Sequence, residues 1–353
     1  MDDERREFLE ALLTTPSPSG FETRGQRVWL DYVESFADDV WTDAYGNAVA
    51  VHEGTGDGPA VAVTGHADEI GYIVRDVTED GFLRISPIGG ADRSVSKGQH
   101  VTIHADDGDV QGVIGQLAIH LRGEETEYDD LREQFVDVGV DTEAEAQDLV
   151  SVGDPVTATT TLQRLAGNRL AARGMDNRVG TWAAAEALRR AQARDVDATV
   201  YAVSTVQEEV GTVGAQMVGF DLEPDAVVAV DVTHATDIPD LDTKFEGPVE
   251  LGGGPVVSRG SINHPVLVDL ARETAAEEGI DVQLQAAGIR TYTDADSFAV
   301  ARGGTPSLTV SVPNRYMHTP VEVVDTGDLD ALADLLAATA DRAAGVESFD
   351  VVL

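Results

Sequence analysis

Residues 59–68 read PAVAVTGHAD, an apolar run of alanine and valine that ends on a histidine and an aspartate. A short apolar run of this kind, bounded by proline and glycine, is typical of a strand that is buried on both faces of a sheet. Similar segments occur at residues 48–54, 198–206, 225–231 and 305–312. We therefore expect a sheet that is built largely of buried strands.

Helical segments accompany these strands. Near the N-terminus, Phe8, Leu9, Leu12 and Leu13 recur at the spacing of one apolar helix face. The same kind of pattern predicts helices at residues 3–14, 23–36, 177–194, 264–279 and 327–344. Apolar strands that alternate with helices predict an α/β fold, with a mixed, mostly parallel sheet flanked by helices.

Residues 71–164 interrupt this alternation. Short segments with β-branched residues are separated there by Gly and Asp turns, with little helix between them; they lie at 72–77, 81–88, 100–105, 110–119 and 154–162. We interpret this stretch as a small all-β, barrel-like domain inserted into a catalytic domain made of residues 1–70 and 165–353. Within the insertion, the acidic segment 120–137 is expected to form a loop or a frayed helix.

The charge of the chain is extreme. There are 64 acidic residues against 24 basic ones, a formal net charge of −40, and only Lys97 and Lys244 are lysines. Repulsion among so many like charges destabilises a compact protein in dilute buffer, but at molar salt the Debye length falls to roughly 3 Å and screens it. The composition fits either an acidic mesophilic enzyme or a halophilic one, and the scarcity of lysine favours the second. The negative charge also disfavours nucleic acid or an anionic membrane as a partner.

The sequence offers no targeting or redox signal. Residues 1–13, MDDERREFLEALL, are charged and lack an apolar signal core. The chain has no apolar run of about 18 residues, the length that predicts a transmembrane helix. It has no cysteine, so neither disulfides nor thiolate metal ligands are available. We expect a cytoplasmic protein.

Side chains of metal-binding type lie where the predicted strands give way to loops. They are His66, Asp68, Asp176, Glu208, Glu209, Asp231 and His318. Such loops converge at the carboxyl ends of the strands in an open α/β sheet. Two histidines with at least three carboxylates match the ligands of a hydrolase that holds two divalent ions, one carboxylate bridging them. His120 and His234 are weaker candidates for the same site.

Two pairs within this set suggest a division of roles. His66 and Asp68 are two residues apart, so an extended chain points both to one side, and the carboxylate can orient the histidine ring. Glu208 and Glu209 point in different directions on an extended segment, so that one can bind metal while the other takes a proton from water. Singly, each residue also has a plainer explanation as a polar loop, a solvated surface, a helix N-cap or a structural histidine.

Several segments resemble the signature segments of the tetrahedral (TET) aminopeptidases, also called the glutamyl aminopeptidase or cellulase-M-like metallopeptidases. The segments are GHADEIGYIV, RGMDNRVG, VQEEVGTVGA, AVDVTHATD, YTDAD and PNRYMHTPVEVVD, which begin at residues 65, 173, 206, 229, 292 and 313. The similarity runs in order along nearly the whole chain, from LLTTPSPSGFE to the last predicted helix. The segment 120–137 and the acid-rich composition are where this chain is most individual.

The resemblance implies two divalent metal ions in each subunit, Zn²⁺ or Co²⁺, bridged by Asp176. It implies that Glu209 and His318 complete the ligands of one ion. His66 and Asp231 complete the ligands of the other.

The resemblance also implies roles and an assembly. Glu208 is expected to be the general base that acts on a metal-activated water, and Asp68 to be the partner that orients His66. The inserted β-domain is expected to mediate dimer contacts, and the dimers to assemble into a hollow tetrahedral dodecamer.

We weigh three functions. The favoured one is a di-metal aminopeptidase that removes N-terminal residues from short peptides. The mixed apolar and polar content of residues 232–240 and 288–298, which are expected to line the substrate pocket, suggests a broad or neutral side-chain preference. The second is a deacylase or carboxypeptidase that acts on another amide. The third, a non-catalytic assembly protein, is disfavoured because all seven positions carry competent residues.

Overall fold

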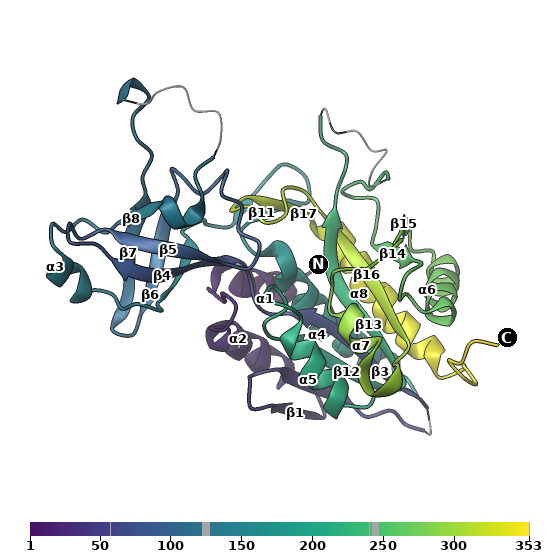
Figure 1. The fold of residues 1–353 in the computed structure, drawn as a ribbon. Coiled ribbons are helices and arrows are strands. Elements are labelled where there is room, and N and C mark those ends of the chain that lie inside the picture. The colour runs from purple at the N-terminus through teal and green to yellow at the C-terminus, as the bar shows by residue number, and fades with distance from the viewer. Residues whose placement is uncertain (57, 122–127, 240, 242–246, 353) are drawn as a thin grey trace.

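A computed structural model describes residues 1–56, 58–121, 128–239, 241 and 247–352. It places an eight-stranded sheet, with helices packed against it, beside a smaller closed barrel (Figure 1). From edge to edge, the sheet consists of β1 (Asp39–Thr42), β2 (Ala48–His52), β12 (Thr199–Thr205), β3 (Ala60–His66), β13 (Ala226–His234), β16 (Ser307–Asn314), β14 (Val256–Arg259) and β15 (Gln283–Ala286).

The middle of this sheet is parallel. Strand β3 pairs in parallel with β12 on one side and with β13 on the other, and β13 pairs in parallel with β16. Strands β14 and β15 are also parallel to each other. The remaining pairings, β1 with β2, β2 with β12 and β14 with β16, are antiparallel. The prediction of a mixed, mostly parallel sheet is confirmed.

Alternate residues of β3 serve two apolar cores. Val61 and Val63 belong to the larger core, and Ala62 belongs to a smaller core that contains Ala215 and Phe298. The larger core includes residues of α1 (Asp3–Thr14), α2 (Thr23–Val33), α4 (Met175–Arg194), α6 (Pro265–Glu278) and α8 (Thr326–Ala343). The smaller core includes residues of α5 (Val213–Asp221) and α7 (Ala295–Phe298). The segment PAVAVTGHAD is therefore buried from both sides, as its composition predicts.

The helices that the sequence predicts are α1, α2, α4, α6 and α8, and the largest difference at an end is at α2, which ends at Val33 rather than near residue 36. The prediction did not include the shorter α5 and α7. Helix α5 contains Gly214 and Gly219, and glycine has a low helix propensity. Tertiary packing against the sheet, rather than local preference, explains this helix.

The barrel is formed by segments of residues 71–158. Its strands, in order around the ring, are β4 (Gly71–Val77), β5 (Leu83–Ile88), β8 (Phe135–Asp137), β7 (Gly108–Ile114), β6 (His100–Ala105) and β9 (Pro155–Ala158). Buried side chains such as Val74, Ile85 and Ile103 fill it. The strand predicted at 110–119 is wrong in its second half: β7 ends at Ile114, because residues 115–118 leave the core and are exposed.

The segment 120–137 is only partly described. Its described parts include the end of the 3₁₀ helix Ile119–Leu121, the 3₁₀ helix Leu131–Glu133 and the strand β8, and the helix α3 (Glu143–Gln147) follows. Residues 122–127 of the predicted loop lie outside the described part of the chain.

The chain passes between the sheet and the barrel at two places, and both adjoin predicted ligands. On the way out, β3 ends at His66 and β4 begins at Gly71. On the way back, β9 is followed by β10 (Gln163–Arg164) and β11 (Arg169–Ala172), which lead directly into α4 and Asp176. Strands β10 and β11 form a small antiparallel sheet with β17 (Glu322–Asp325), which the sequence did not predict.

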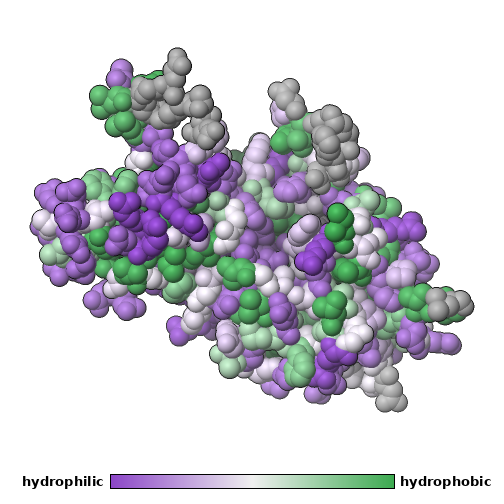
Figure 2. All heavy atoms as spheres, viewed as in Figure 1, coloured by the Kyte–Doolittle hydropathy of each residue, from purple (hydrophilic) through white to green (hydrophobic). Residues whose placement is uncertain are grey.

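The surface matches the composition. Figure 2 shows hydrophilic residues over much of the visible face, with apolar residues scattered among them. Within the described residues, no helix is both long enough and apolar enough to cross a membrane.

Candidate metal centre

The predicted ligands are brought together at the carboxyl ends of the central parallel strands of the sheet. His66 is the last residue of β3, and Glu208 and Glu209 follow the end of its parallel neighbour β12. Asp231 lies within β13, on the other side of β3. Because the three strands are adjacent and run the same way, their carboxyl ends carry these side chains to a common place.

Two groups of ligand atoms share one aspartate. His66, Asp176 and Asp231 form the first group, and Asp176, Glu209 and His318 form the second; within each group the ligand atoms lie within 4.8 Å of one another. Each carboxylate oxygen of Asp176 faces a different histidine. His66 Nε2 is 3.2 Å from Oδ1, and His318 Nε2 is 3.3 Å from Oδ2.

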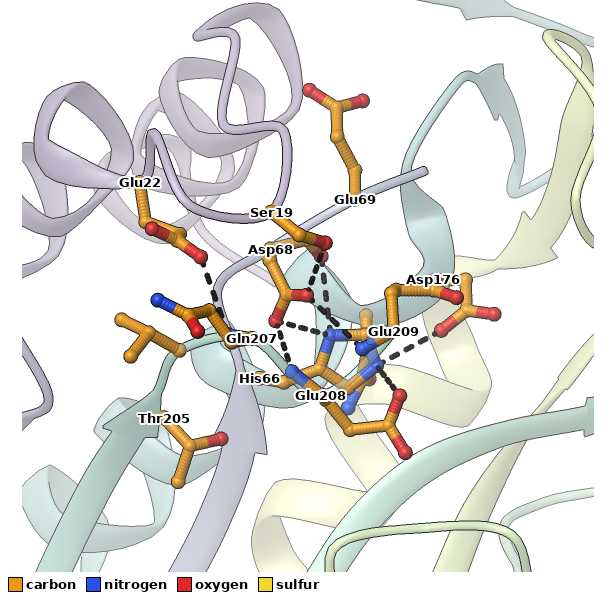
Figure 3. Close-up of polar contacts among 12 residues, drawn as sticks. Ser19, Glu22, His66, Asp68, Glu69, Asp176, Thr205, Gln207, Glu208 and Glu209 are labelled. Atoms are coloured by element: carbon orange, nitrogen blue, oxygen red, sulfur yellow. Dashed lines mark hydrogen bonds and ion pairs between the residues drawn. The ribbon is translucent and has the colours of Figure 1, made fainter. Parts of the chain in front are cut away.

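Asp68 does not belong to either group but supports both (Figure 3). Its carboxylate lies 3.3 Å from Nδ1 of His66, and its backbone oxygen lies 3.1 Å from the same nitrogen. The carboxylate also accepts the backbone N–H groups of Glu208 and Glu209, at 2.9 and 3.1 Å, and the hydroxyl of Ser19 at 2.6 Å. One buried carboxylate therefore fixes the ring of His66 and the turn that carries both glutamates.

Burial and mutual repulsion raise the pKa values of several carboxyl groups of the centre. Burial, together with the charge of Asp176, raises the pKa of Asp231 to about 8 and the pKa of Glu209 well above its usual range. Burial alone would also raise the pKa of Asp176, but hydrogen bonds with His318 and His66 outweigh it and lower this pKa. The centre thus gathers more carboxyl groups than its two histidines can stabilise in the ionised form.

The residues present fit a pair of divalent cations. Cations bound among the carboxylates would stabilise their ionised forms. Within the described part of the chain, Glu209 Oε1 is buried and has no hydrogen-bond partner, which leaves a lone pair available to a cation. Imidazole nitrogen and carboxylate oxygen are ordinary ligands of Zn²⁺, and Asp176 can offer one oxygen to each ion.

Glu208 stands beside the ligands without being part of either group. Its Oε2 lies 3.8 Å from Nε2 of His66. Burial raises the pKa of Glu208 to about 9, and the charges of Asp231 and Asp294 add to this effect. Glu208 is therefore a carboxyl group beside the first ligand group that neither group uses.

A cavity of about 510 Å³ opens at this centre. Besides ligands and Glu208, uncharged polar side chains line it: Thr233, Ser258, Gln285, Thr293, Thr309 and Ser311. Parts of the predicted pocket segments 232–240 and 288–298 are among the lining, although residue 240 lies outside the described residues. His234 also lines the cavity, whereas His120 is exposed on the 3₁₀ helix Ile119–Leu121 and is not part of the lining.

Sequence reasoning missed three residues that support the ligands. The buried carboxylate of Glu322 accepts the backbone N–H groups of Asp176 and His318, at 3.1 and 2.8 Å. The carbonyl oxygen of Gly90, in the turn after β5, lies 3.1 Å from Nδ1 of His318. Neither residue carried a clear signal: Glu322 follows His318 by four residues but is one of 64 acidic residues, and Gly90 is remote in sequence.

The third missed residue is Glu69, which ties together the two loops that carry ligands. Its buried carboxylate pairs with Arg173 and, at 2.6 Å, with Arg178, residues that flank Asp176. It also accepts the backbone N–H of Ser17 at 2.9 Å. The GHADE and RGMDNR segments are thereby held in one arrangement.

Comparisons with known proteins agree with this geometry. The chain is 34% identical to a lysyl aminopeptidase of Pyrococcus furiosus over 92% of its own length and 93% of that protein. Its structure is similar to an aminopeptidase of the archaeon Desulfurococcus kamchatkensis, with a TM-score of 0.89, 33% identity and 96% of each chain covered.

A second solved structure extends this likeness to an assembly-forming peptidase. It is the Pyrococcus horikoshii TET1 peptidase, described as assembling into a tetrahedron or a large octahedral shell; the TM-score is 0.85 at 29% identity, covering 95% of this chain and 99% of that one. The model of the M42 glutamyl aminopeptidase family matches residues 46–335. The chain therefore belongs to the M42 glutamyl aminopeptidase family of peptide-bond hydrolases.

Proposed function

We propose that this protein is a di-metal aminopeptidase that removes N-terminal residues from short peptides. The observation that carries the proposal is the pair of ligand groups that share Asp176. In the proposal, His66 and Asp231 complete the ligands of one divalent ion. Glu209 and His318 complete those of the other.

When bound, the two cations polarise the substrate carbonyl and lower the pKa of water. Glu208 takes the proton of the attacking water on a carboxylate oxygen and delivers it to the nitrogen of the leaving amine. Asp68 keeps the His66 ring in the orientation that turns Nε2 towards Asp176, a role supported by its contacts with Nδ1. We propose Zn²⁺ or Co²⁺ as the ions, as the family resemblance implies, and imidazole nitrogen with carboxylate oxygen is an ordinary ligand set for Zn²⁺.

The cavity suggests what the enzyme accepts. A free amino terminus carries a positive charge, and the cluster of carboxylates around Asp176 suits such a group. Hydroxyl and amide side chains form much of the remaining lining, and Arg290 adds a positive charge. We infer a broad or neutral preference for the first side chain, since the described lining beyond the metal centre offers no carboxylate to a basic residue.

We propose a homo-oligomer for the protein in the cytoplasm, with the insertion 71–164 as its dimerisation domain. The proposal rests on the likeness to structures described as a dodecamer and as a tetrahedral or octahedral shell. A tetrahedral dodecamer built from dimers is the favoured assembly. Light scattering in high salt would test the mass of the particle.

An assay with amino-acid anilides in high salt tests the activity. We expect release of aniline from substrates with a free amino group, its loss after chelation, and its recovery when Zn²⁺ or Co²⁺ is added. Matched N-acylated substrates should remain intact. Loss of the acyl group from the acylated set instead would identify the deacylase alternative, and cleavage of N-acylated peptides with a free carboxylate would identify the carboxypeptidase alternative. Failure of the protein to bind two ions in each chain would favour a non-catalytic role.

A further inference from the structure

A turn of the barrel reaches into the metal centre. Gly89 and Gly90 directly follow β5, whose last residue is Ile88. A Cβ atom on Gly90 would lie 2.7 Å from Nδ1 and 2.8 Å from Cε1 of the His318 ring. A Cβ atom on Gly89 would lie 3.1 Å from Cβ of Glu209. The turn thus packs against the two ligands that belong only to the second group.

The contact with Gly90 sets the chemistry of the His318 ring. Nδ1 lies 3.1 Å from the Gly90 carbonyl oxygen, which can only accept a hydrogen bond, so Nδ1 carries the proton. Nε2 is therefore the nitrogen left for a cation, and it faces Asp176 Oδ2 at 3.3 Å and Glu209 Oε2 at 3.7 Å. This is the tautomer that a metal ligand needs.

The two histidines of the centre differ in which part of the chain orients the ring. His66 is held by Asp68, two residues along the same segment, and its side chain is only 2% exposed. The side chain of His318 is 35% exposed, so less of the surrounding protein restrains it. Its ring depends on a carbonyl group from the barrel, far away in sequence.

We propose that the Gly89–Gly90 turn is a positioning element for the ion held by Asp176, Glu209 and His318, which makes that ion dependent on the barrel. The inference rests on the proposed di-metal function and goes beyond it, because it assigns the barrel a part in forming the centre. The ion on His66 and Asp231 lacks this dependence, since the turn contacts neither residue's ring or carboxylate in the described contacts.

The test is calorimetric titration of the metal-stripped, full-length protein with Zn²⁺. The variant Gly90→Ala is expected to bind one ion roughly 10- to 100-fold more weakly, the range typical of losing the partner of a ligand. The other ion should bind as in the unaltered protein. Gly115→Ala is the matched control, because it lies after β7 of the same barrel and its Cβ would meet no atom within 4 Å.

Two further variants make the result decisive. Asp231→Asn should weaken the ion that Gly90→Ala leaves unchanged, which identifies the two sites. Gly89→Ala presses on Ile70 and Glu209 rather than His318, at a backbone φ of 62°, and should weaken the same ion as Gly90→Ala. Near-ultraviolet circular dichroism of the metal-free variants shows whether each is folded. Unaltered affinity for both ions in folded Gly90→Ala and Gly89→Ala would overturn the inference while leaving the proposed function intact. Failure of the unaltered protein to bind two ions would overturn both.

Discussion

The backbone N–H of Asp176 donates a hydrogen bond to one oxygen of the Glu322 carboxylate, at 3.1 Å. The other oxygen of the same carboxylate accepts the N–H of His318 at 2.8 Å. Glu322 is 1% exposed, so water does not compete for these contacts. The buried side chain of Glu322, on β17, therefore fixes the distance between Asp176, which both ligand groups share, and His318, which belongs to the second group only.

This relationship predicts the effect of Glu322→Gln. The amide nitrogen cannot accept a hydrogen bond, so one of the two backbone N–H groups loses its partner. An unpaired buried donor costs about 1–3 kcal/mol, and we expect the free energy of unfolding of the metal-free protein to fall by that amount. Urea denaturation measures it. A change no larger than that of Glu79→Gln, an exposed control on the barrel, would contradict the prediction.

Glu208→Gln separates proton transfer from metal binding. Glu208 belongs to neither ligand group, so the variant should keep two ions in each chain, as measured by mass spectrometry of the native protein. Turnover of an aminoacyl anilide should fall by roughly 10²- to 10⁴-fold, the contribution typical of a general base. If the variant retains its turnover, another group takes the proton and the assignment is wrong.

Much of the fold and of the ligand set was accessible from the sequence. The strands rich in alanine and valine are buried on both faces, so they read as continuous apolar runs and differ from the periodic pattern of amphipathic helices. His66 and Asp231 lie on such strands. Local patterns could not reveal that Gly90 meets His318, because that contact joins two parts of the chain that are remote in sequence. Glu69 and Glu322 were missed for a related reason: in a chain with 64 acidic residues, a carboxylate that is buried by tertiary structure looks like any other.

Glu69 predicts a dependence of stability on pH. Burial alone would raise its pKa, but the charges of Arg173 and Arg178 outweigh it and lower the pKa to about 2. A carboxyl group whose pKa is lowered by folding stabilises the fold above its ordinary pKa, and the stabilisation disappears as the pH falls towards the lowered value. Glu69→Gln should therefore destabilise the protein on the order of 3 kcal/mol at pH 7.

The difference in the free energy of unfolding between the unaltered protein and Glu69→Gln should shrink as the pH falls from about 4.5 towards 2. This is the interval between the ordinary and the lowered pKa of Glu69. Urea denaturation of both proteins at several pH values, with Glu79→Gln as an exposed control, provides the measurement. A difference that stays constant down to pH 3 would contradict the assigned pKa.

Gly65 is predicted to tolerate no side chain. A Cβ atom at this position on β3 would lie 2.3 Å from the backbone carbon of Gly180 on α4, and a backbone cannot rotate away as a side chain can. Gly65→Ala should cost at least about 3 kcal/mol of stability, at the upper end for overpacking. Comparison with Gly115→Ala by thermal unfolding tests this, and equal midpoints for the two variants would refute it.

The net charge of −40 predicts that salt stabilises the protein. The Debye length shortens from about 10 Å at 0.1 M to about 3 Å at 1 M, so most of the gain in the unfolding midpoint should appear below 1 M KCl. Sucrose at matched osmolality controls for exclusion of solutes from the surface. An equal rise of the unfolding midpoint in sucrose, or no rise of the midpoint in KCl, would rule out charge screening as the cause.

The turn that carries Gly90 limits how freely this architecture can be re-engineered. A truncated version without the insertion would lose the acceptor on the His318 ring, even if the sheet folded around the gap. Grafting a foreign insertion at the same junctions would have to supply a carbonyl group at that position and leave room beside it. The barrel and the peptidase sheet are therefore not interchangeable modules, and they are expected to change together over evolution.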